Sequence, residues 1–97
     1  MSDHHAPRLP IAPRSEVLWF GGEMERKLQN HAWKSHWSGL TQKNLRRQLL
    51  AKVKELVRAV EGKGPKAKAQ QIKHATNVAN FAMMIADNAA REEGEDE

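Results

Sequence analysis

The chain has 97 residues, which is the size of one small domain. It contains no cysteine, which excludes a disulfide framework and thiolate chemistry. No apolar run approaches the roughly 20 residues that span a bilayer, and residues 1–14 lack the apolar core of a signal peptide. With 39% hydrophobic and 29% charged residues, the composition is typical of a globular domain, and we expect it in the cytoplasm with no membrane partner.

Charge is unevenly distributed along the chain, although the net value is only +4. Residues 34–73 hold eleven lysines and arginines against Glu55 and Glu61, whereas residues 92–97 hold five acids. The basic stretch is suited to phosphates or nucleic acid. A solvated helix face followed by an acidic, solubilising tail explains it equally well.

Three segments are expected along the chain. Residues 1–14 contain three prolines and the pair His4 and His5, and are typical of a flexible arm without a metal site. Residues 15–90 form the helical domain, and residues 91–97 form the acidic tail.

The first helix is expected to begin at Ser15, which is a good N-cap residue, with Glu16 near the positive end of the helix dipole. Gly21 and Gly22 interrupt the pattern, and close backbone packing would explain them. Its apolar face recurs every three or four residues, at Val17, Phe20, Met24 and Leu28.

The helical periodicity fades over residues 30–39, where Trp33 and Trp37 stand beside Lys34. Aromatic and basic residues together can stack on nucleic-acid bases. The interpretation that we favour is that the tryptophans close one end of a small core.

The second helix is predicted over residues 41–60 and the third over residues 66–90, joined by a short basic loop over residues 61–68 with Pro65. From Ala75 onward the third helix is apolar on nearly all sides, which indicates packing from several directions. We therefore expect an all-α bundle of three to four helices that is completed by homo-oligomerisation. The buried stripe of the second helix is predicted to comprise Leu45, Leu49, Val53, Leu56 and Val60, widened by Leu50 and Val57.

Three segments carry a family resemblance: LWFGGEMERKL (residues 18–28), LRRQLLAKVKELVRAVE (45–61) and IKHATNVANFAMMIADN (72–88). Together they resemble phage-borne members of the all-α, MazG-like nucleoside triphosphate pyrophosphohydrolases, and the resemblance covers residues 16–88. It implies a helical bundle and, in active members, Mg²⁺-dependent conversion of a nucleoside triphosphate to the monophosphate and pyrophosphate.

The family pattern is E-x-x-E on one helix and E-x-x-D on the next. Residues three apart share a helix face, so two such pairs bring four carboxylates, which suit Mg²⁺, to one point. Aligned to this pattern, the first pair falls at Lys52 and Glu55 and the second at His74 and Asn77. The formal charge of the four positions is thus 0 with a neutral histidine instead of −4, and we expect a degenerate metal site with no catalytic residue and no metal. Upstream, Ala32 and Trp33 precede Lys34 where relatives have an acid and a histidine.

Two local outcomes follow from these substitutions. Lys52 could stand in for the metal and bind phosphate without cleaving it, with help from Lys34, Arg46 and Lys54. Alternatively, Lys52 pairs with Glu55 along the helix, while His74 and Asn77 satisfy hydrogen bonds in a helix interface.

The leading hypothesis is a catalytically degenerate MazG-like domain that acts by binding a protein partner or a phosphate-bearing ligand, as a phage-encoded inhibitor or regulator of a host factor. It needs no cofactor. One alternative is an active pyrophosphohydrolase that uses Mg²⁺ held by relocated acids. Another is a helical nucleic-acid-binding module that uses the basic stretch.

Overall fold

The computed structural model describes residues 12–31 and 36–95, and over those residues its secondary structure is entirely helical. The elements are α1 (Ser15–Asn30), the 3₁₀ helix η1 (Trp37–Gly39), α2 (Gln42–Glu61) and α3 (Ala67–Glu95). The predicted all-α bundle is confirmed. None of the described helices contains an apolar stretch long enough to cross a membrane.

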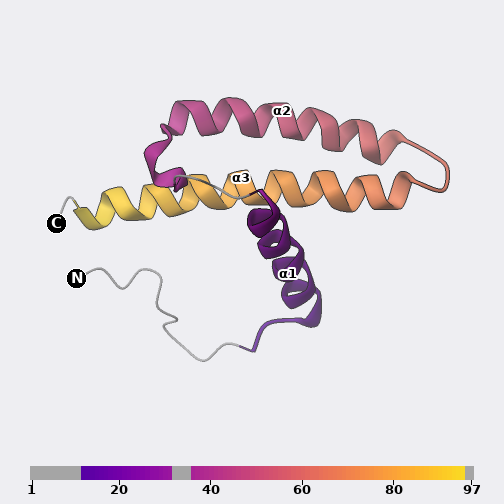
Figure 1. The fold of residues 1–97 in the computed structure, drawn as a ribbon, viewed down its shortest axis with the longest axis horizontal. Coiled ribbons are helices and arrows are strands. Elements are labelled where there is room, and N and C mark those ends of the chain that lie inside the picture. The colour runs from indigo at the N-terminus through magenta and orange to yellow at the C-terminus, as the bar shows by residue number, and fades with distance from the viewer. Residues whose placement is uncertain (1–11, 32–35, 96–97) are drawn as a thin grey trace.

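Helices α2 and α3 form an antiparallel hairpin (Figure 1). Helix α2 begins where the Thr41 hydroxyl accepts a hydrogen bond from the Asn44 backbone N–H, at 3.0 Å. The chain reverses at Gly64, whose φ of 107° lies in the left-handed region that favours glycine. After the turn, the Gln71 side chain donates to the Ala59 carbonyl oxygen at 3.2 Å, which sets the register of the two helices.

A small core lies where the other elements meet α3. Leu45, Phe81 and Met84 are the buried hydrophobic residues of the described chain. Helix α1 crosses α3 steeply (Figure 1) and contributes Leu28 to the edge of this core. The remaining partly buried members are Trp37, Leu40, Leu49, Met83 and Ile85.

The η1 turn is fastened to the C-terminal half of α3 by polar contacts. The Trp37 indole N–H donates to Asp87 at 3.0 Å, and the Asn88 amide donates to the Trp37 carbonyl oxygen at 3.1 Å. Arg91 also donates to Asp87, at 2.9 Å, and this contact over one helical turn supports α3 beyond residue 90. Helix α3 extends to Glu95, the last described residue, and so passes the predicted residue 90. Trp37 packs against the core as predicted, whereas Trp33 lies outside the described residues, as do His4 and His5.

Two details of the predicted first helix are wrong. Arg14, and not Ser15, occupies the N-cap position of α1, and no side chain caps it. The helix also runs unbroken through Gly21 and Gly22, where an added Cβ would meet nothing within 4 Å. Close backbone packing therefore does not explain these glycines.

The prediction of a buried stripe on α2 is correct only for the residues on the side of α3. Leu45 is buried, Leu49 is half-buried against the core, and Leu56 is half-buried. Val53 and Val60, which were predicted to be part of this stripe, are exposed, at 36% and 60% of their surface. The widening positions Leu50 and Val57 are exposed as well. Helix α3 covers only about half of the apolar surface of α2. The other half is exposed in the described structure.

We expect the substitution Leu45→Ala to lower the free energy of unfolding by about 2–5 kcal/mol, because it opens a cavity in a core this small. Urea unfolding monitored by circular dichroism, at a fixed protein concentration, measures the change. The matched control is Leu18→Ala on α1, where the side chain is 62% exposed. It should change the stability by less than about 0.5 kcal/mol. Equal losses in the two variants would show that Leu45 is not central to the core.

Candidate functional site

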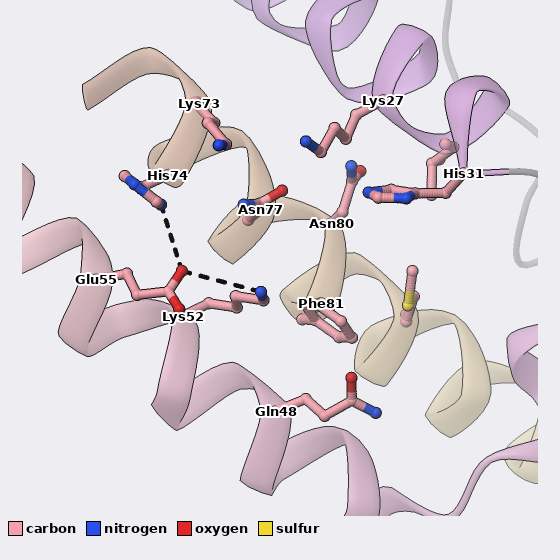
Figure 2. A pocket seen from close by; sticks show the side chains of 12 residues that line it. Lys27, His31, Gln48, Lys52, Glu55, Lys73, His74, Asn77, Asn80 and Phe81 are labelled. Carbon is pink, nitrogen blue, oxygen red and sulfur yellow. Dashed lines mark ion pairs between the residues drawn. The ribbon is translucent and has the colours of Figure 1, made fainter. Parts of the chain in front are cut away.

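A pocket of about 610 Å³ lies between α1, α2 and α3 (Figure 2). Its volume is within the range of roughly 300–1,000 Å³ that small-molecule sites occupy. The pocket is open to solvent on one side of the hairpin and combines charged, amide and apolar side chains. It is lined by Lys27, Leu28, His31, Gln48, Lys52, Glu55, Lys73, His74, Asn77, Asn80, Phe81 and Met84.

All four positions of the predicted degenerate site line this one pocket. Lys52 and Glu55 lie one turn apart on α2, and His74 and Asn77 lie one turn apart on the facing part of α3. The antiparallel hairpin brings the two pairs together, as the alignment with the family pattern implies. Figure 2 shows Glu55 between Lys52 and His74.

The Glu55 carboxylate is shared by two neighbours. Its Oε1 atom lies 3.9 Å from the Lys52 ammonium nitrogen and 3.4 Å from Nδ1 of His74. Nε2 of His74 lies 3.1 Å from the side-chain oxygen of Gln70. A neutral imidazole carries one N–H and serves one of these two oxygens, so the contact with Glu55 becomes an ion pair only when the ring is protonated. Lys52 is therefore the permanent counter-ion of Glu55, and its ammonium group occupies the space beside the carboxylate.

Two further lysines, which the sequence analysis did not select, face the same space. Figure 2 shows the amino groups of Lys27 from α1 and Lys73 from α3 directed toward the pocket. Three lysines against the carboxylate of Glu55 leave a formal charge of +2 with neutral histidines. Lys73 precedes His74 and is one turn from Asn77, so helical spacing could have identified it. Helical spacing could not have identified Lys27, because its place at the pocket depends on the angle at which α1 crosses α3.

Amide and apolar groups complete the pocket wall. Asn80 is buried, and its amide donates to the Met24 carbonyl oxygen at 3.2 Å, which ties α1 to α3. Its side-chain oxygen has no hydrogen-bond partner. Phe81 and Met84, both of which belong to the core, form the apolar part of the wall. A ligand with an anionic end and an apolar or aromatic end would find matching groups here.

The donor set does not fit Mg²⁺. This ion is bound by carboxylates and phosphates in octahedral geometry, and Glu55 supplies the only carboxylate among the described lining residues. His74 and Asn77 supply no negative charge, and Lys52 adds a positive one. Within the described part of the chain, no group of three or more His, Cys, Asp or Glu side chains is placed to hold a metal ion.

The other predicted phosphate-binding residues are not brought to the pocket. Arg46 and Lys54 lie on α2 with exposed side chains and do not line it. Lys54 is two residues from Lys52, so it points away from the face that Lys52 presents. Lys34 lies outside the described residues.

Comparison of the chain with models of known protein families, with curated protein sequences and with solved structures finds no match.

Restoring the acids of the family pattern should create a metal site. The triple variant Lys52→Glu, His74→Glu and Asn77→Asp changes the pocket's formal charge from +2 to −2, because four carboxylates then face Lys27 and Lys73. We expect isothermal titration with Mg²⁺ to show binding to this variant.

The parent chain, titrated under identical conditions, should bind no Mg²⁺. A triple variant that retains its helical circular dichroism spectrum and still ignores the ion would contradict the alignment of these four positions with the family pattern.

Proposed function

We propose that this chain binds a phosphate-bearing small molecule in the three-helix pocket without a metal ion and without hydrolysing it. We propose further that it is a non-catalytic relative of the MazG-like pyrophosphohydrolases, acting through binding. The observation that carries the proposal is the charge of the pocket. Lys27, Lys52 and Lys73, one from each helix, face a single space that contains one carboxylate, already paired.

Lysine provides what a metal-free phosphate site needs. Its ammonium group is a compact charge with three donors that can turn toward phosphate oxygens. In an active metal-dependent site, the cation is held by acids and bridges to the substrate. Lys52 places a fixed cation beside Glu55, so a phosphate group can be attracted without a recruited ion.

Hydrolysis is not supported by the lining residues. Attack of water on a phosphate requires activation of the water and stabilisation of the charge that develops on the leaving group. Glu55 would be the candidate base, but Lys52 and His74 share its carboxylate. The pocket therefore favours retention of an anion over its turnover.

Binding should be measured by isothermal titration with inorganic tripolyphosphate and with a nucleoside triphosphate, both in the presence of a chelator. We expect both to bind the parent chain, and we expect Lys52→Ala and Lys73→Ala each to weaken binding about tenfold, through loss of a charge-assisted contact. The matched control is Lys54→Ala, since this lysine lies on the same helix outside the pocket.

If Lys54→Ala weakens binding as much as Lys52→Ala, the attraction comes from the general charge of α2 and the pocket is not the site. If tripolyphosphate and the nucleotide both fail to bind the parent, the proposed function is wrong. Release of pyrophosphate from the nucleotide in the presence of Mg²⁺ or Mn²⁺ would instead support the active-enzyme alternative.

A further inference from the structure

A second pocket, of about 480 Å³, adjoins the first at the turn of the hairpin. Glu55 of α2 and His74 of α3 line both pockets. Their side chains face each other across the hairpin, with Oε1 of Glu55 lying 3.4 Å from Nδ1 of His74. The two pockets therefore meet at this pair, and we refer to them together as the basic groove.

The second pocket adds three basic side chains, those of Arg58 on α2 and of Lys63 and Lys66 in the turn. All three residues are exposed, and none of them forms an ion pair with a described acid. With the three lysines of the first pocket, the basic groove holds six basic side chains, and Glu55 is the only acid among its described lining residues. Its formal charge is +5 with neutral histidines, which exceeds the +4 of the whole chain. Like charges gathered in one groove attract an anionic partner.

The basic groove is longer than a site for one small anion. On the side of α2, its lining residues run from Gln48 to Gly62, a length of about 20 Å at the rise of an α-helix. Lys52 and Arg58 are six residues apart on this helix, so the basic groups of the two pockets are about 9 Å apart. Successive phosphates of one nucleic-acid strand rise about 3.4 Å along a helical axis, so the groove has the length of about six nucleotides. A ligand whose charges repeat along a chain matches this spacing.

One end of the groove is apolar, which favours a nucleic-acid strand over a plain polyphosphate. Phe81 and Met84 lie beyond His74 on α3, at the end of the groove farther from the turn (Figure 2). Proteins that bind single strands combine a basic track for the backbone with aromatic side chains for the bases. A polyphosphate chain would use the basic side chains and leave this apolar wall uncovered.

The width of the groove favours a single strand over a duplex. The groove runs between α2 and α3, and the axes of packed helices are about 8–10 Å apart. The major groove of a DNA duplex alone is about 12 Å wide. A duplex would therefore rest on the rim of the groove, whereas a single strand enters it.

We infer that the basic groove binds a single strand of nucleic acid, of which about six nucleotides contact the protein. The phosphates lie along the basic side chains of both pockets, and a base lies against Phe81 and Met84. This inference rests on the proposed function, because the lysines of the first pocket contact phosphate in both. It goes further in its use of Arg58 and Lys66, which the small-molecule site does not include.

Fluorescence anisotropy of a labelled oligothymidylate of about six nucleotides, titrated with the parent chain in the presence of a chelator, tests the inference. The double variant Arg58→Ala with Lys66→Ala should weaken oligothymidylate binding at least about tenfold, because it removes two phosphate contacts. It should also reduce the slope of log affinity against log salt concentration by about 1.4, since each contact to a single strand contributes about 0.7. Its binding of tripolyphosphate should stay within about twofold of the parent.

The matched control is the double variant Arg46→Ala with Lys68→Ala, which removes the same charge from two exposed residues that do not line the groove. Its oligothymidylate affinity should stay within about twofold of the parent. Circular dichroism of both double variants confirms that the helices are retained. An equal loss of affinity in the control would assign the attraction to the general charge of the chain and would overturn the inference.

Three further results would overturn it. One is an inorganic polyphosphate of similar length that binds as tightly as the oligothymidylate, because the bases would then add nothing. Another is a stable DNA duplex that competes equally per phosphate, because the groove would then not select a single strand. The third is oligothymidylate that does not bind a parent chain which binds tripolyphosphate. Failure of tripolyphosphate alone, with oligothymidylate bound as expected, would instead contradict only the proposed small-molecule function.

Discussion

Helix α3 is the support on which the described structure depends. Helices α1 and α2 and the η1 turn each pack on α3, while α1 and α2 make no close backbone approach to each other. Leu45 of α2 packs against Phe81 and Met84 of α3 in the apolar core. Trp37 and Arg91 donate hydrogen bonds to Asp87 of α3, and the bond from Trp37 holds the η1 turn on this helix. The pocket exists because α1 and α2 approach α3 from two directions and leave the space between them open.

This arrangement gives the hairpin two flanks with different properties. One flank holds lysines, amides and a paired carboxylate. The other exposes the apolar side chains of Leu50, Val53, Val57 and Val60 on α2. Because each residue of a helix is rotated by about 100° from the one before it, residues of both flanks are interspersed along the same stretches of sequence.

Helical periodicity was sufficient to predict the fold class and the hairpin. The positions Lys52, Glu55, His74 and Asn77 were selected by their alignment with the MazG-like family pattern, and the hairpin places all four on one pocket. Periodicity did not predict Lys27, whose place in the pocket depends on the crossing of α1 and α3. Periodicity also did not distinguish the apolar residues of α2 that α3 covers from those that are exposed. Apolar side chains recur at the same spacing whether or not a neighbouring helix covers them. The predicted end of the third helix at residue 90 was wrong; α3 continues through Arg91, whose side chain contacts Asp87 one turn earlier.

The central claim is that Lys52 and its neighbours take the place of a metal ion in attracting phosphate. The most direct test is the dissociation constant of one nucleoside triphosphate, measured once with a chelator and once with excess Mg²⁺. We expect binding to be as tight or tighter in the chelator, because the free triphosphate carries more negative charge toward the lysines than its magnesium complex does. Binding that occurs only when Mg²⁺ is present would contradict it.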